Sequence, residues 1–246
     1  MRRTFFRVAA VVGLLLLLQT TAAHAIPAPT ERLDGTPSEW YWLHNVTPQQ
    51  VTDLLNDTGA RLIDIEIQST DPLRFAAAFV QNEGVHQVSG WWWYYNATQA
   101  DVSNLLDTNQ ARLIDIERYD GDRFAVIMVN NTGAEAKTWW WYVNQSVSQM
   151  SDLLDQNGAR LIDFESRDTA GGTLVDGIMV ENSGDDASGW YWWVNVDEAF
   201  ISAQIQETGY RIVDLDVVES SGEPRFDVIM MPPESKWWWY FGQTAS

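Results

Sequence analysis

The sequence predicts a mainly β fold with short helices, arranged as a four-unit, propeller-like closed ring of three-stranded meanders linked by helices. An aromatic cluster recurs at steps of 51, 48, 51 and 47 residues, beginning at Trp40, Trp91, Trp139, Trp190 and Trp237. Two further motifs keep pace with this cluster in four copies each. Three motifs in phase indicate tandem repeats of one structural unit.

Each aromatic cluster except the last is followed by a predicted helix. Residues that favour a helix N-cap occupy one place in the repeat, at Thr47, Thr98, Ser146 and Asp197. Apolar residues follow at helical spacing, as at Val51, Leu54 and Leu55. Glycines stand where the helix must end, at Gly59, Gly158 and Gly209, and Gln110 takes that place in the second repeat.

The two remaining motifs are rich in branched and aromatic residues, which is typical of strands. The first reads ARLIDIE at Ala60 and Ala111, ARLIDFE at Ala159 and YRIVDLD at Tyr210. The second reads RFAAAFV at Arg74, RFAVIMV at Arg123 and RFDVIMM at Arg225, with TLVDGIMV at Thr173 as a deviant copy. Both faces of the second motif are apolar, so we expect its strand to be covered on both sides.

The motif count predicts the architecture. Five aromatic strands stand against four copies of the other two, so we expect each meander to run from the RLID strand through the RF strand to the next aromatic strand. The first aromatic strand, 40–43, is then left over, and it closes a ring by joining the last sheet. An open repeat solenoid, in which this strand is a cap, is the alternative.

The N-terminus predicts export. Arg2, Arg3 and Arg7 precede an apolar run, and a small-x-small cleavage site follows, so residues 1–25 resemble a secretory signal peptide. We expect a linker over 26–39 and one repeat domain over 40–246, with units near 40–90, 91–138, 139–189 and 190–236 and a closing strand at 237–241. The mature chain is expected to be secreted or extracytoplasmic and to have no membrane span.

Charge and composition exclude several classes of function. Without the signal peptide, 12 Lys and Arg face 34 Asp and Glu, which argues against nucleic-acid binding. The chain has no cysteine, so packing must hold the fold and thiolate zinc sites are excluded. Acidic loops near Asp120 and Ser183 lack the regular spacing of calcium ligands. We expect no metal and no cofactor.

Taken together, the motifs RLIDIE, RFAVIMV and WWWYYN resemble the bacterial tandem repeat domain family. Repeats of that family also form the N-terminal part of secreted fungal polyglycine hydrolases. The resemblance covers about 38–242, and Thr173 and Leu174 depart from it. In the fungal enzymes the activity belongs to a separate β-lactamase-like serine hydrolase domain, and no Ser-x-x-Lys motif occurs here. The resemblance therefore implies a recognition or accessory module.

The tryptophans have two interpretations. Alternate residues of a strand point to opposite faces, so each triplet must serve both faces of its sheet. Most of these rings are expected in the core, and a subset is expected to contact ligand. The candidates for ligand contact are Trp91, Trp93, Trp139, Trp141, Trp190 and Trp192.

The RLID motif supplies a set of charged candidates. An arginine precedes an aspartate by three residues, which on a regular strand sends the two side chains to opposite faces. Structural ion pairs between neighbouring units are the main interpretation, and a charged centre that reads a ligand is the alternative. The residues are Arg61, Asp64, Arg112, Asp115, Arg160, Asp163, Arg211 and Asp214.

No catalytic constellation is evident. The only histidines of the mature chain, His44 and His86, have no motif-placed serine or metal-ligand partner. We therefore expect a secreted, non-enzymatic repeat protein that binds an extracellular polymer or protein. One alternative is a hydrolase of glycans or peptides that uses carboxylates in a central or inter-repeat cleft. Another is a structural unit of a cell envelope. The ligand and the oligomeric state stay open.

Overall fold

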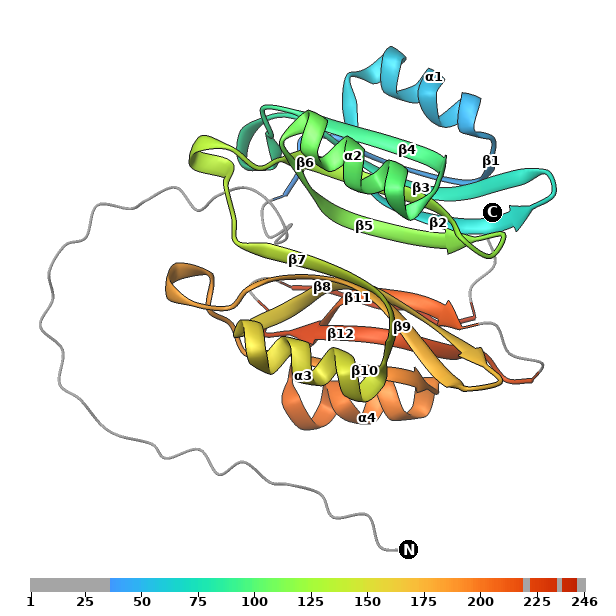
Figure 1. The fold of residues 1–246 in the computed structure, drawn as a ribbon, viewed down its shortest axis with the longest axis vertical. Coiled ribbons are helices and arrows are strands. Elements are labelled where there is room, and N and C mark those ends of the chain that lie inside the picture. Colours follow the sequence, from blue (N-terminus) through green and yellow to red (C-terminus); the bar gives the residue numbers. More distant parts are fainter. Residues whose placement is uncertain (1–35, 219–221, 234–235, 243–246) are drawn as a thin grey trace, which may run out of the picture.

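A computed structural model describes residues 36–218, 222–233 and 236–242. The expected signal peptide, 1–25, and most of the expected linker lie outside these residues. The described chain is mainly β with short helices, as predicted (Figure 1). Its α-helices are α1 Pro48–Thr58, α2 Gln99–Asn109, α3 Val147–Asn157 and α4 Glu198–Thr208. Its strands are β1 Trp40–Val46, β2 Ala60–Thr70, β3 Leu73–Gln81, β4 Trp91–Ala97, β5 Ala111–Tyr119, β6 Arg123–Asn130, β7 Trp139–Ser146, β8 Ala159–Thr169, β9 Gly172–Glu181, β10 Tyr191–Val196, β11 Arg211–Val218 and β12 Arg225–Met231.

These strands form four antiparallel sheets of three strands each. Their orders are β1-β3-β2, β4-β6-β5, β7-β9-β8 and β10-β12-β11, so the RF strand is central in every sheet. Each sheet takes all its strands from one repeat. We refer to these sheets with their helices as units 1 to 4. Figure 1 shows units 1 and 2 in the upper half of the molecule and units 3 and 4 in the lower half.

The predicted assignment of strands to meanders was wrong. The aromatic strand that pairs with each RF strand precedes the helix instead of following the RF strand. Within a sheet, the aromatic and RLID strands are both antiparallel to the RF strand and so run parallel to each other, and parallel strands need a long crossover connection. The helix is that connection. Strand β1 therefore belongs to unit 1 and is not left over.

The chain turns into each helix at a fixed point. Asn45, Asn96, Asn144 and Asn195 adopt positive φ, and the pairing register shifts there, so each aromatic strand ends in a bulge. Reciprocal capping boxes join Thr47 to Gln50, Thr98 to Asp101 and Ser146 to Gln149. Left-handed residues end the helices at Gly59, Gln110, Gly158 and Gly209. The predicted helices are thus confirmed, and in unit 2 Gln110 itself takes the left-handed conformation that glycine takes in the others.

Neighbouring units bury each other's apolar faces. The core of unit 1 contains Val51 of its helix and Phe75 of its central strand, and Trp91 and Trp93 of unit 2 pack against it. The ring of Trp93 meets Phe75 edge-on, with centroids 6.0 Å apart. The same contact recurs along the chain: Trp139 and Trp141 cover the core of unit 2, and Trp190 and Trp192 cover that of unit 3. The middle tryptophans, Trp92 and Trp140, pack on the core of their own unit.

The two ends of this row of units differ. Trp40 and Trp42, the counterparts of Trp91 and Trp93, are 67% and 52% exposed because no unit of the described chain packs in front of them. At the other end the fifth aromatic segment, 237–241, forms no strand in the described structure, although a closing strand was expected there. Its Trp239 nevertheless packs against the core of unit 4. No closed ring is seen in the described part of the chain.

The equivalent residues Trp93 and Trp42 allow a matched test of this packing. We expect Trp93→Ala to lower the free energy of unfolding by about 3 to 5 kcal/mol, because it leaves a cavity at a buried junction. Trp42→Ala removes an exposed ring and should cost less than about 1 kcal/mol. Urea denaturation of both variants measures the difference. Equal losses would show that the junction does not depend on the flanking tryptophan.

Candidate functional site: a buried carboxyl cluster

The four RLID strands meet in the interior of the molecule. Strands β2, β5, β8 and β11 lie side by side in chain order, although each belongs to a different sheet. Two cavities run along them. One is lined by a first layer of carboxyl groups, Asp64, Asp115, Asp163 and Asp214. The other is lined by a second layer, Glu66, Glu117, Glu165 and Asp216. We call these eight groups the carboxyl cluster.

A bulge in each RLID strand turns the acids toward this interior. The pairing register shifts between Leu62 and Asp64, and it shifts at the same place in the other three units. Because of the extra residue, Leu62 and Ile65 both reach the core of unit 1, while Arg61 and Asp64 both line the first cavity. The expectation that Arg61 and Asp64 point to opposite faces, which assumed a regular strand, was therefore wrong.

The carboxyl groups join neighbouring units through backbone donors. The N–H of Ile65 in unit 1 donates to Asp115 Oδ2 at 3.0 Å, and that of Ile116 in unit 2 donates to Asp163 Oδ2 at 2.7 Å. The N–H of Phe164 in unit 3 donates in the same way to Asp214 of unit 4. Asp115, Asp163 and Asp214 thus each accept a hydrogen bond from the residue that follows the aspartate of the preceding unit. These bonds connect strands that share no sheet.

The second layer repeats this connection at two junctions. Glu117 Oε2 accepts from the N–H of Ile67 at 3.2 Å. Both carboxyl oxygens of Glu165 accept from the N–H of Arg118, at 3.2 and 3.1 Å. The two layers therefore hold consecutive RLID strands together in place of a backbone ladder.

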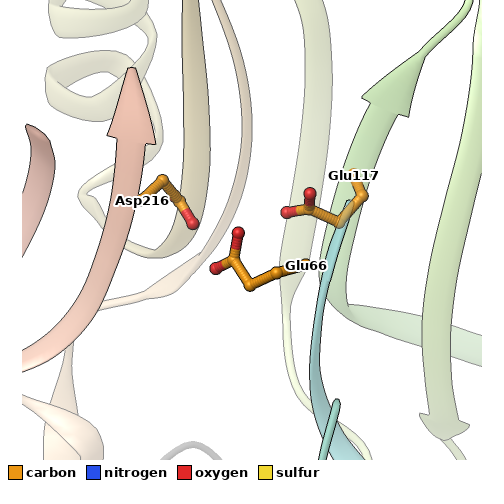
Figure 2. Close-up of side chains that lie close together, drawn as sticks. All are labelled: Glu66, Glu117 and Asp216. Carbon is orange, nitrogen blue, oxygen red and sulfur yellow. The ribbon is translucent and has the colours of Figure 1, made fainter. Parts of the chain in front are cut away.

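The junction between units 4 and 1 lacks such a backbone bond among the described residues, and two acids face each other there, as Glu117 and Glu165 also do between units 2 and 3. Glu66 of unit 1 and Asp216 of unit 4 form a carboxyl to carboxyl hydrogen bond. One oxygen each from Glu66, Glu117 and Asp216 lie within 4.8 Å of one another. Figure 2 shows these three side chains pointing toward a common point from separate strands. Asp216 also belongs to a second such group, with Asp163 and Asp214.

Burial governs the protonation of the cluster. Loss of water contact, followed by repulsion from neighbouring acids, raises the pKa well above its ordinary value for Glu66, Asp115, Glu117, Asp163, Asp214 and Asp216. Burial also raises the pKa of Glu165 to about 7. Partial desolvation raises the pKa of Asp64 to about 6, although its side chain reaches the water of the cavity. Solvent screening reduces what this shift contributes to stability.

The arginines of the RLID motif lie inside the fold. Arg61, Arg112 and Arg160 are buried, and Arg211 is half-buried. The Nε of Arg61 donates to the carbonyl of His86 at 2.9 Å. We expected the RLID charges to connect neighbouring units. The aspartates do so, by accepting hydrogen bonds from backbone N–H groups of the neighbouring unit. Pairing of these arginines with the aspartates stays a prediction.

Four buried acids outside the RLID aspartates escaped the sequence analysis: Glu117, Asp216, Asp227 and Asp176. The last makes a buried ion pair between units. Asp176 on β9 is 1% exposed and lies 2.5 Å from Arg118 Nε of unit 2 and 2.9 Å from Arg167 Nη1. It also accepts the N–H of Asn144 at 2.6 Å. Its counterpart in unit 2 is Ala125, because Glu117 faces Ala125 and Glu165 faces Asp176. An acid in the deviant copy of an otherwise apolar strand was the available sign.

The tryptophans proposed to contact ligand are all partly buried at the unit junctions. The strongly exposed aromatic residues of the described chain are others, and sequence reasoning did not select them. They are Trp40, Trp42, Tyr95, Tyr191, Trp238, Tyr240 and Phe241. Trp40 and Trp42 are exposed because they belong to the first repeat of the described chain. Their place in that repeat was a sign of this exposure that the sequence analysis did not use.

The raised pKa values predict an unusual pH dependence. An acid that binds its proton more tightly in the folded state favours folding below its unfolded pKa and loses that contribution as pH rises through its folded pKa. In EDTA, we expect the thermal midpoint to fall between about pH 4 and pH 7. Glu165 alone contributes on the order of 2 kcal/mol after screening. Calorimetry across this pH range tests the prediction, and a thermal midpoint that rises toward pH 7 would contradict it.

The buried ion pair between Asp176 and Arg118 predicts a large mutational effect on stability. Asp176→Ala leaves the buried Arg118 without its inter-unit partner, so we expect a loss of about 3 kcal/mol. The control Asp186→Ala breaks an ion pair with Lys137 in which Asp186 is half exposed, and should cost less than about 1 kcal/mol. Urea denaturation measures the free energy of unfolding of both variants. Similar losses would contradict the prediction that the buried pair matters more than the exposed one.

Comparison with known proteins adds no assignment. No protein-family model matches the chain, and no curated protein matches it. The resemblance to the bacterial tandem repeat domain family therefore rests on the repeat motifs alone, and function is argued from the geometry above.

Proposed function

We propose that the protein is a secreted, non-enzymatic recognition module that binds an extracellular polymer or protein through the exposed aromatic face of unit 1. The observation that carries this proposal is the exposure of Trp40 and Trp42, whose counterparts in units 2 and 3 are covered by packing against the preceding unit. An apolar surface of this kind in contact with water marks a binding site.

The face has the composition of a stacking surface. Trp40 and Trp42 border an apolar cavity of about 300 Å³ together with Ile63, Ala78 and Val80. His44 stacks on Trp42, with ring centroids 5.2 Å apart, and extends the aromatic surface. Flat aromatic rings offer large contact area to apolar and amphipathic partners, and they lose little conformational entropy on binding.

A propeller-like arrangement of the four units, in which unit 4 meets unit 1 at the carboxyl cluster while the aromatic face of unit 1 stays open, is part of the proposal. Its support is the meeting of Glu66 and Asp216, which brings the first and last units into contact inside the molecule. Secretion is supported by the expected signal peptide at 1–25. No helix in the described residues is both long enough and apolar enough to cross a membrane.

The arrangement of acids favours recognition over the hydrolase alternative. A catalytic pair should stand in one unit where the others carry neutral residues, because one cleft needs one acid and one base. Here all four units carry acids in both layers. If the protein is a structural unit of a cell envelope, the same aromatic face would make contacts between copies. Only an experiment can distinguish that function from ligand recognition.

The test is tryptophan emission of the protein titrated with soluble glycans, peptidoglycan fragments and a glycine-rich peptide. We expect a saturable shift with one class, lost in a Trp40→Ala, Trp42→Ala double variant. Trp238→Ala removes an equally exposed ring at the other end of the chain and should leave the shift unchanged.

A shift that persists in the double variant would refute this assignment of the binding face. Analytical sedimentation of the parent protein and of the double variant tests whether the face instead joins copies of the chain in a cell envelope. Self-association that the double variant abolishes, with no response to any ligand, would replace recognition by assembly.

A further inference from the structure

We propose that the carboxyl cluster binds a calcium ion through Glu66, Glu117 and Asp216, and that this ion fastens unit 4 to unit 1. The inference goes beyond recognition at the aromatic face and does not depend on it. It also departs from the sequence-based expectation of no metal, because that expectation considered loops and not the interior.

The geometry of the three oxygens fits a hard cation. They lie within 4.8 Å of one another and come from β2, β5 and β11, so an ion among them would touch three units (Figure 2). A set made only of carboxylates favours calcium, magnesium or manganese. Oxygens on opposite sides of Ca²⁺ stand about 4.6 to 5.2 Å apart, against about 4.0 to 4.2 Å for Mg²⁺. A separation of at most 4.8 Å is compatible with both ions, and coordination habit favours calcium: Ca²⁺ accepts six to eight oxygens in flexible geometry, whereas Mg²⁺ demands a near-ideal octahedron and dehydrates reluctantly.

An unsatisfied buried oxygen is the second observation. Asp216 is 8% exposed, and its Oδ2 is buried without a hydrogen-bond donor among the described residues, apart from the facing carboxyl of Glu66. Asp214 Oδ2 and Asp115 Oδ1, in the first layer, share this condition. A buried acceptor without a donor costs about 1 to 3 kcal/mol, and more when it is charged. A cation beside Asp216 removes that cost.

The two arginines that line the cavity of the second layer are directed to other partners. Arg118 and Arg167 line the same cavity, but both donate to Asp176. Arg118 makes its further bonds to Asp122 and to the carbonyl of Gly121. The positive charge at the second layer is thus directed away from Glu66, Glu117 and Asp216.

The position of the site gives it a structural consequence. At the other three junctions a backbone N–H donates to a carboxylate of the next unit. At the fourth junction the facing groups are both acids, which repel once both are ionised. A calcium ion there supplies the positive partner that the backbone supplies elsewhere.

The experiment is calorimetric titration of CaCl₂ into EDTA-stripped, dialysed protein at pH 7.5. We expect one strong site per chain, with a Kd no weaker than about 1 mM, and a rise in the thermal midpoint. MgCl₂ should give at least tenfold weaker binding. Equal affinity for both ions would overturn the assignment to calcium, and the absence of heat and of a thermal shift would overturn the site.

Amide variants locate the ion without creating a cavity. Asp216→Asn and Glu66→Gln should each weaken binding at least tenfold, and in EDTA they should be as stable as the parent or more so, because they remove a repelling charge. Asp152→Asn, on the exposed face of α3, is the matched control and should bind like the parent. Undiminished binding by Asp216→Asn would show that calcium binds elsewhere.

Hydrogen exchange tests the fastening itself. Calcium should slow exchange of backbone amides in β2 and β11 at least several-fold and leave the amides of α3 unchanged. Calcium binding without this slowing of exchange would support the calcium site but refute its role in fastening unit 4 to unit 1.

Discussion

Every unit of this fold depends on its neighbour for burial. A three-stranded sheet with one helix covers its own core on one side only, and the next unit supplies the missing wall with two tryptophans from its outer strand. Small sheets of this kind bury too little apolar surface to be stable alone. Stability is therefore a property of the junctions, and the tryptophans recur because the junction recurs.

The same repetition explains the carboxyl cluster. A single bulge in each RLID strand keeps leucine and isoleucine in the core while turning aspartate inward, so four copies of one local irregularity bring like charges together. Three junctions use these charges productively, since a carboxylate is a strong acceptor for a backbone N–H of another sheet. The fourth junction has no such bond among the described residues, and Glu66 and Asp216 face each other there instead.

The sequence predicted local structure well and pairing poorly. Caps, helix lengths and strand positions follow from short-range chemistry, although the left-handed residue that ends α2 is Gln110 itself and not its neighbour Asn109. Strand partners were not, because RLID, RF and WWW strands can be grouped in two ways that satisfy the same motif order. The register shift at Asp64 gave no compositional sign, so the faces of Arg61 and Asp64 were misjudged. The buried role of Asp176 requires a partner two strands away in another unit.

The direction of the junctions has a consequence for the molecule as a whole. Because each contact joins the helix-bearing side of one unit to the tryptophan side of the next, it is heterologous, and a row built this way has two unlike ends. One end presents a flat aromatic wall, and the other is covered by the segment around Trp239. The molecule therefore has a head and a tail, and anything that binds it end-on must approach from a single direction.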